Sequence, residues 1–243
     1  MASLDSQVDQ MVTDPAGYFH RSATQIHSIS RDKQDIMQLL GLRLRFEQLR
    51  DRVPILKKLA DEQRVGEITE LDDVVPLLFS HTVYKSYPVS LLEQNRFAQL
   101  TRWLQKLTTV DLSELDVSGC DGVDDWIGRI DAHTPIRIRT SSGTSGQMSF
   151  IPRTVREADR HFYSMAIGTC DPVGLRVPTP EQPLDMHLVI PTFRSGYSGV
   201  LRPNDYYRAA IAGGDESKAH FLYPSQQSAD LMFSPGACGR RRP

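Results

Sequence analysis

Apolar residues recur at spacings of three and four over the first half of the chain, which is the pattern of amphipathic helices. The clearest stripe covers residues 32–53, where arginine and acidic residues fill the positions between the apolar ones. Pro54 ends this stripe, because proline lacks the N–H donor that a helix interior needs. We expect a short further helix over 55–63 and another over 90–107, where Ser90-Leu-Leu-Glu93 has the form of a capping box.

The hydrophobic period shortens to two residues in the middle of the chain. The alternation Ile136-Arg-Ile-Arg139 predicts a half-exposed strand, which runs into Ser141–Gln147, a segment of small residues. Phe150-Ile-Pro152 is a candidate second strand, and Thr154-Val-Arg-Glu157 is another capping box that predicts a helix to about residue 168. The predicted local order is therefore strand, glycine-rich loop, strand and helix.

The C-terminal part of the chain continues this mixed pattern. It predicts a strand, a glycine-rich stretch, a short helix, a second strand and the start of a helix, over 184–190, 194–199, 205–212, 220–223 and 229–233.

Together these patterns predict an α/β protein in three parts. A helical N-terminal region over 1–70 is followed by a domain with an incomplete mixed sheet over 71–233. The last ten residues, 234–243, show neither period, and we expect an irregular tail there, for which a shifted reading frame is one explanation.

Composition excludes several classes of protein. The chain has 28 basic and 30 acidic residues, and its net charge of -2 lacks the positive footprint of a protein that binds nucleic acid through its phosphates. Cys120, Cys170 and Cys238 are odd in number and form no C-x-x-C pair, which argues against a disulfide framework and favours a reducing compartment. No signal peptide or apolar run of about 18 residues is present, so we expect a cytoplasmic protein without a membrane span.

Other chemistry-bearing residues favour structural interpretations. The seven histidines form no H-E-x-x-H or similar ligand pair, so no metal site is expected. Cys120 and Cys170 could be nucleophiles for an acyl-thioester, but neither has a recognisable basic setting, and we expect small buried thiols instead. Asp124 and Asp125 open a predicted helix, where the helix dipole favours acidic side chains.

The small residues of Ser141–Gln147 allow two interpretations. Glycine lets the backbone approach a phosphate closely, and Ser142, Thr144 and Ser145 supply hydroxyl groups. The segment is not a Walker A motif, because no lysine follows Gly146. Composition alone therefore leaves open a solvated turn or a phosphate-binding loop.

Thr140–Ser149 resembles the phosphate loop of the adenylate-forming superfamily, [ST]-S-G-[ST]-[ST]-G-x-P-K, and Ser142–Gly146 matches that pattern without a gap. Upstream, Tyr84-Lys-Ser-Tyr-Pro88 is similar to the K-x-x-Y-P segment of phenylacetate-CoA ligases and acyl-protein synthetases. The resemblance covers about residues 70 to 230, and also includes Leu188-Val-Ile-Pro191 with the glycine-rich stretch after it. It implies the fold of an adenylate-forming N-terminal domain.

The resemblance also implies a ligase reaction. A carboxylic acid, with a long-chain fatty acid as one candidate, would attack the α-phosphate of ATP, and the acyl-adenylate would pass its acyl group to a protein or coenzyme A thiol. Mg²⁺ would arrive with the nucleotide. The implied phosphate contacts are Ser142, Gly143, Thr144, Ser145 and Gly146.

The sequence departs from the family pattern at two positions of this loop. Met148 and Ser149 stand where the family often has proline and lysine, so the implied cationic contact is missing unless Arg153 supplies it. His187 lies where family members tend to line the acyl pocket, although a polar residue on the wet face of a strand explains it equally well.

Segments that the family carries further along have no counterpart here. These are the Y-G-x-[ST]-E segment, the ribose-binding aspartate and the C-terminal lysine. We therefore expect an N-terminal portion that does not complete acyl transfer by itself. The alternative is a non-catalytic remnant or interaction module on the same fold.

Overall fold

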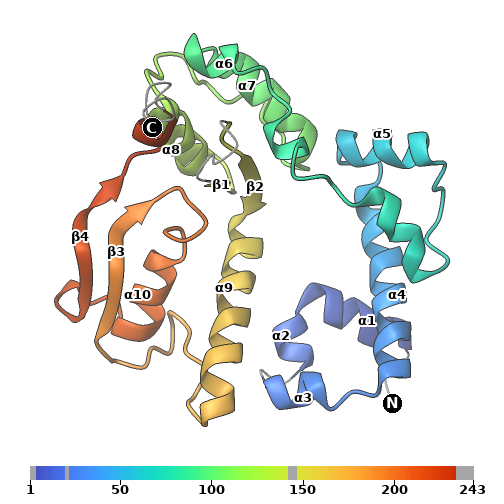
Figure 1. Cartoon of the computed structure of the whole chain (residues 1–243). Coiled ribbons are helices and arrows are strands. Elements are labelled where there is room, and N and C mark those ends of the chain that lie inside the picture. The colour runs from blue at the N-terminus through green and yellow to red at the C-terminus, as the bar shows by residue number, and fades with distance from the viewer. Residues whose placement is uncertain (1–3, 20–21, 142–146, 234–243) are drawn as a thin grey trace, which may run out of the picture. The chain divides into compact units, whose positions relative to one another are not determined.

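The computed structural model describes residues 4–19, 22–141 and 147–233. Figure 1 shows a mixed α/β chain in which helices predominate and the strands form small sheets. The chain divides into two compact units: the first contains residues 1–80, 106–109 and 163–177, and the second contains the remainder. None of the helices in the described ranges has the length and apolar content needed to cross a lipid bilayer.

The first unit is helical. Its elements are α1 (Leu4–Thr13), α2 (Pro15–Tyr18), α3 (Ala23–His27), α4 (Arg31–Leu49), α5 (Pro54–Gln63) and the 3₁₀ helices η1 (Leu71–Leu77) and η4 (Asp171–Val173). The last two residues of the 3₁₀ helix η3 (Gln105–Leu107) and the second half of α9 (Val155–Cys170) also belong to this unit. The helices predicted over 32–53 and 55–63 are confirmed as α4 and α5, and α4 ends at Leu49, before Pro54. Proline is tolerated as the first residue of α5, because the N–H it lacks would have no partner there. Phe46, Ala60, Ile68 and Leu77 form the buried core between these helices.

The second unit combines helices with the strands. Its helices are η2 (Val83–Lys85), α6 (Ser90–Glu93), α7 (Phe97–Leu104), α8 (Val123–His133), the first half of α9 (Val155–Cys170), α10 (Asn204–Ala212), η5 (Glu216–Lys218) and α11 (Ala229–Phe233).

The helix expected over 90–107 is interrupted. Asn95, with φ of 51°, separates α6 from α7, and Val89 rather than Ser90 is the N-cap of α6. The predicted capping box at Ser90 was therefore wrong: Ser90 is already inside a single helical turn, and no side chain caps it. The apolar spacing of three and four residues is confirmed within α7, because Phe97, Leu100 and Leu104 are buried.

Four strands are present among the described residues. β1 (Ile136–Thr140) and β2 (Phe150–Thr154) pair antiparallel, with Thr140 opposite Phe150 at the end nearest residues 142–146. β3 (Leu188–Gly196) and β4 (Ala219–Gln227) pair in parallel and lie side by side in Figure 1. The described strands therefore form two separate two-stranded sheets, one antiparallel and one parallel, instead of the single mixed sheet that the sequence predicted. An isolated parallel bridge links Thr140 to Ser198, two residues beyond β3.

The strand expected over 184–190 begins later than predicted. Leu184 and Met186 donate their N–H groups to the carbonyls of Ala210 and Ile211, at 3.0 and 2.9 Å, near the end of α10. The last carbonyls of a helix have no partner within it, so this segment satisfies them instead of joining the sheet. β3 starts at Leu188 and continues beyond Pro191, where its register with β4 becomes irregular.

The capping box predicted at Thr154 is confirmed. Glu157 Oε2 accepts the Thr154 N–H at 2.8 Å, and Thr154 Oγ1 accepts the Glu157 N–H at 3.2 Å. This reciprocal pair ends β2 and starts α9, which runs to Cys170.

Two aspartates join α8 and α11 at their first turns. The Asp124 carboxylate accepts the Ala229 N–H at 2.8 Å, and the Asp230 carboxylate accepts the N–H groups of Val123 and Asp124 at 2.6 and 3.0 Å. Each helix thus caps the start of the other. Gly122 lies beside this contact, and a Cβ there would lie 2.6 Å from Asp230 Oδ2, so a larger residue would displace the carboxylate.

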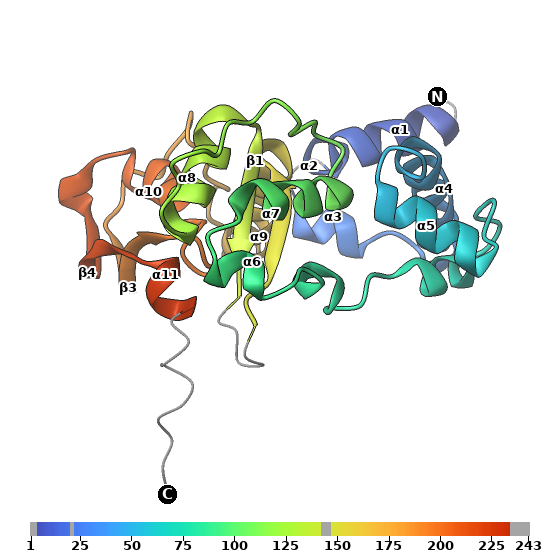
Figure 2. The ribbon, with the colours of Figure 1, turned by 90° about the horizontal axis from the view of Figure 1, so that it is seen from above.

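Aromatic side chains form the core of the second unit. The Phe150 ring from β2 packs against Trp126 of α8 and Tyr87, with centroid distances of 5.1 and 5.3 Å. Trp126 donates its indole N–H to Thr101 of α7 at 2.9 Å, which satisfies the polar atom of a fully buried ring. In Figure 2, α8 lies beside β1, whose Ile136 side chain is fully buried.

Candidate functional site

The predicted phosphate contacts Ser142, Gly143, Thr144, Ser145 and Gly146 lie outside the described residues. The structure does describe both ends of their segment. β1 ends at Thr140 and β2 begins at its pairing partner Phe150. The glycine-rich segment therefore connects two neighbouring antiparallel strands, as the predicted strand, loop and strand order requires.

Tyr87 holds the C-terminal end of this segment. Its hydroxyl donates to the Met148 carbonyl at 2.7 Å, and the Gln147 side-chain amide donates to the Tyr87 carbonyl at 2.8 Å. Tyr87 is only 3% exposed, and burial raises the pKa of its phenol well above the usual range, so the hydroxyl keeps its proton. Trp103 packs on the Tyr87 ring and donates to the Ser86 hydroxyl at 2.9 Å. The tyrosine-proline segment and the glycine-rich segment, 61 positions apart at this hydrogen bond, are therefore in direct contact.

The two positions that depart from the family pattern lie inside the fold. Met148 and Ser149 are both buried, and Ser149 donates its N–H to the Ser141 hydroxyl at 3.2 Å, across the base of the segment. Ser149 therefore supplies no positive charge. It fixes the geometry where the segment rejoins β2.

The glycine-rich stretch near residue 197 holds the other end. Thr140 donates its N–H to the Tyr197 carbonyl at 2.8 Å, and its own carbonyl accepts from the Gly199 N–H at 3.3 Å. Arg202 Nε donates to the Ile138 carbonyl at 2.8 Å. The edge of β1 that does not pair with β2 is thus covered by residues 197–202, directly before the predicted phosphate loop.

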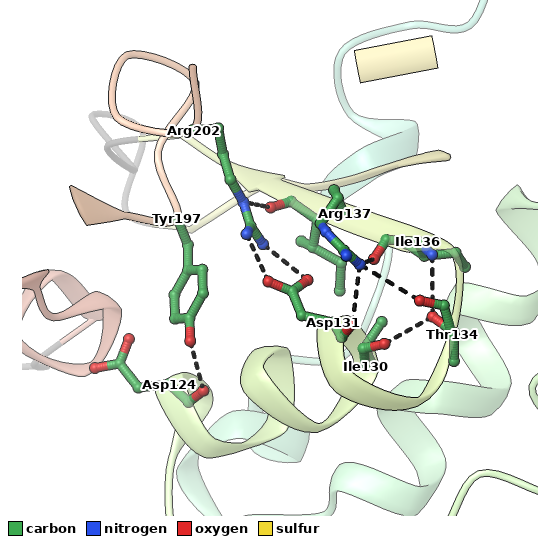
Figure 3. A network of polar contacts seen from close by, with 9 residues as sticks. Asp124, Ile130, Asp131, Thr134, Ile136, Arg137, Tyr197 and Arg202 are labelled. Carbon is green, nitrogen blue, oxygen red and sulfur yellow. Dashed lines mark hydrogen bonds and ion pairs between the residues drawn. The ribbon is translucent and has the colours of Figure 1, made fainter. Parts of the chain in front are cut away.

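Arg202 also joins this edge to α8. Its guanidinium forms two contacts with the Asp131 carboxylate, Nη1 to Oδ2 at 2.5 Å and Nη2 to Oδ1 at 3.0 Å (Figure 3). The two side chains are 13% and 20% exposed, so solvent screens this pair only weakly. The guanidinium also lies over the Tyr197 ring, 4.7 Å from its centroid. Tyr197 in turn donates to the Asp124 carbonyl at 3.4 Å.

Arg137 fixes the start of β1 to the end of α8. Its Nη1 donates to the carbonyls of Asp131 and Ile136 at 2.9 and 2.8 Å (Figure 3). A cation at the C-terminal end of a helix is stabilised by the helix dipole as well as by these bonds. Thr134 completes the corner, since its hydroxyl donates to the Ile130 carbonyl and accepts from the Ile136 N–H.

Three arginines share one face of the β1–β2 hairpin, which we call the arginine face: Arg137, Arg139 and Arg153. Arg153 pairs with Arg137, three residue pairs from the closing pair Thr140–Phe150, which is about 10 Å along the strand. Arg139 is one pair from it. Arg153 as the substitute phosphate contact stays a prediction, and Arg139 is a nearer cation that the sequence analysis did not single out. The alternation of isoleucine and arginine was the available signal for it.

The histidine and cysteine candidates have structural surroundings. His187 is exposed, as the polar interpretation predicted, but it lies one residue before β3 and not on a strand; its Nδ1 is 3.0 Å from Nε2 of His220 on β4. Cys120 is buried as predicted, and burial raises the pKa of its thiol, the reverse of what a nucleophile needs. Cys170 is only partly buried, so that prediction was wrong for it. Within the described ranges, no group of three or more histidine, cysteine or acidic side chains is placed to hold a metal ion.

Comparison with protein-family models, with curated proteins and with solved structures gave no match.

Proposed function

We propose that this protein acts in the ATP-dependent activation of a carboxylic acid as an acyl-adenylate, with Ser142–Gly146 as the phosphate-binding residues. One observation carries the proposal. The three segments that the motif resemblance selects, at 84–88, 141–147 and 194–199, meet at the two ends of one hairpin connection.

The contacts suit a phosphate-binding role physically. Backbone N–H and hydroxyl donors stabilise a phosphate most when they are held in place before it arrives, because no free energy is then spent on ordering them. Tyr87 fixes the C-terminal end of the segment, and the main chain of Tyr197 and Gly199 fixes the N-terminal end. The arginine face adds positive potential beside the hairpin, which favours the approach of a polyanionic nucleotide.

The partners of the reaction follow from the proposed chemistry. ATP would arrive with Mg²⁺, which neutralises part of its charge, and the acyl group would pass to a thiol of a protein or of coenzyme A. In this proposal the chain's own residues bind and orient the nucleotide. Rate acceleration would come mainly from that positioning.

A displacement titration tests the proposal. The 243-residue chain would be titrated with a fluorescent ATP analogue, which would then be displaced by an octanoyl-adenylate mimic with a sulfamoyl group in place of the phosphate. The matched control compound is sulfamoyl-adenosine without the acyl chain. We expect the acyl compound to displace the probe at a concentration at least about tenfold lower than the control, because it fills acyl and nucleotide subsites together.

Two results would contradict the proposal. A chain that shows no saturable binding of the ATP analogue would favour the non-catalytic interaction module. Equal displacement by the acyl and acyl-free compounds would indicate a nucleotide-binding protein without an acyl subsite.

A further inference from the structure

Two histidines lie together at the beginning of the β3–β4 sheet. His187 comes one residue before β3, and His220 is the second residue of β4. Nδ1 of His187 lies 3.0 Å from Nε2 of His220. The ring planes differ by 7° and the ring centroids are 5.2 Å apart, so these two nitrogens face each other across the gap. The fold thus forms a histidine pair from residues 33 positions apart in the sequence.

The backbone holds both histidines in place before any ligand arrives. His220 belongs to the ladder between β4 and β3. On the other side, Met186 donates its N–H at 2.9 Å to a carbonyl near the end of α10 and so fixes the residue before His187. An ion pair between Lys218 and Asp185 joins the two segments two residues before each histidine. A ligand that needs both rings therefore meets a site whose main chain is already ordered.

Both rings are open to solvent. His187 and His220 are exposed, and Val189, which pairs with His220 across the sheet, is 73% exposed. No other hydrogen bond of either ring is present in the described part of the chain. A hydrogen bond between the two nitrogens needs one of them to carry a proton, and at an exposed site water replaces such a bond at little cost. The pair contributes little to folding and is accessible to a solute.

The distance between the two nitrogens fits neighbouring ligands of one metal ion. Imidazole nitrogen is the commonest metal ligand that side chains supply. An ion bonded to both nitrogens at about 2.0–2.1 Å would form an angle of about 95° between them, given their separation of 3.0 Å. This angle is close to the one of about 90° in the square-planar and tetragonal complexes of Cu²⁺ and Ni²⁺, and it is farther from the one of about 110° in tetrahedral Zn²⁺ sites.

We infer that His187 and His220 form a binding site for a divalent late transition metal ion, with Cu²⁺ bound more tightly than Ni²⁺ or Zn²⁺. The proton between the two nitrogens moves through water to the outer nitrogen of the same ring. Each exposed ring then turns about its Cβ–Cγ bond, so that both free lone pairs reach the ion, and water completes the coordination. The order of affinity is that of divalent ions at nitrogen ligands in general.

A carboxylate adds negative potential beside this pair. Two hydrogen bonds from Ser217 hold the pKa of Asp215 below its usual value, and the charges of Lys218 and His187 lower it further. Asp215 is therefore ionised at neutral pH and lies within electrostatic range of His187. Lys218, the positive charge nearby, is paired with Asp185. Asp215 favours a cation at the histidine pair through this field, while the two imidazoles supply the protein ligands.

The inference is tested by calorimetric titration of the 243-residue chain, without any affinity tag, with Cu²⁺, Ni²⁺, Zn²⁺ and Mg²⁺. We expect saturable binding of Cu²⁺, weaker binding of Ni²⁺ and Zn²⁺, and no measurable binding of Mg²⁺, which prefers oxygen ligands. Electron paramagnetic resonance of the complex with one equivalent of Cu²⁺ should show two imidazole nitrogens coupled to the copper.

Substitutions at the two histidines locate the site. We expect His187→Gln and His220→Gln each to weaken Cu²⁺ binding by at least about tenfold, because the ion keeps only one of two ligands that are held together. His81→Gln removes an exposed histidine elsewhere in the second unit and should bind Cu²⁺ as the wild type does. Thermal unfolding of each variant shows whether it is folded.

The inference is overturned if the wild type shows no saturable binding of Cu²⁺, or if the resonance spectrum shows at most one coupled imidazole. Unchanged affinity in either folded glutamine variant at position 187 or 220 would also overturn it. Tighter binding of Zn²⁺ than of Cu²⁺ would reject the assigned coordination. The spectrum uses the wild type only, so it decides the question even if a variant does not fold, and none of these results depends on nucleotide binding.

Discussion

The two faces of the β1–β2 hairpin differ in burial and in charge. On the inner face, Ile136, Ile138 and Phe150 are fully buried against the aromatic core of the second unit. On the arginine face, Arg139 and Arg153 are partly exposed and like charges are close together. Alternation along a strand separates the two sets of side chains although they share one backbone. Stability and ligand chemistry can therefore change independently, and substitutions on each face test that separation.

The largest effect is expected on the inner face. Phe150→Ala removes a fully buried ring that contacts both Trp126 and Tyr87, and should lower the free energy of unfolding by about 3–5 kcal/mol. Urea unfolding monitored by tryptophan fluorescence measures the change. A loss below about 1 kcal/mol would mean that the inner face is not the core of this unit.

A smaller effect is expected for the ion pair at the edge of β1. Asp131→Ala leaves the Arg202 guanidinium partly buried without its carboxylate, and should lower the free energy of unfolding by about 2–3 kcal/mol. Glu62→Ala is the matched control, because the Lys58–Glu62 pair is exposed and contributes little. Equal, small changes in the two variants would show that Arg202 does not hold the edge of β1.

Tyr87→Phe tests the contact between the inner core and the end of the glycine-rich segment. The substitution keeps the ring but leaves the buried Met148 carbonyl without its donor, at an expected cost of about 1–2 kcal/mol in unfolding free energy. If the segment binds nucleotide, affinity for ATP should also fall, because its anchored end is loosened. Unchanged stability together with unchanged ATP affinity would exclude Tyr87 as an anchor.

The smallest effect on stability is expected for Arg153→Ala on the arginine face. The substitution should leave the unfolding free energy nearly unchanged and weaken ATP binding about fivefold if Arg153 supplies the cationic contact. Equilibrium titration with ATP measures this. Identical ATP affinity in the wild type and the variant would remove Arg153 from the site.

Local signals in the sequence predicted much of the fold. The alternation at residues 136–139 and the capping box at Thr154 depend only on neighbours in sequence, and both were confirmed. The predicted start of β3 was wrong because Leu184 and Met186 donate their N–H groups to carbonyls near the end of α10, more than twenty positions away. Hydrophobic periodicity carries no information about such long-range partners.

The candidate site shows the same division between local and distant information. The glycine-rich segment was visible in the sequence, and so was the tyrosine-proline segment. Their contact through Tyr87 and Met148 required the three-dimensional structure. Arg139 was visible only as one member of an alternating strand, and its packing over the Phe162 ring of α9 and its place in the lining of a cavity required the structure.

The central claim is that the segment between β1 and β2 binds nucleotide phosphates, and ATP titration of the wild type and Gly143→Val tests it most directly. Valine adds a branched side chain where the resemblance expects the backbone to approach the phosphates closely. We predict that ATP affinity falls by more than about tenfold, equivalent to about 1.4 kcal/mol, while the melting temperature is retained. Equal ATP affinity in the wild type and Gly143→Val would contradict the claim and make the segment an ordinary turn.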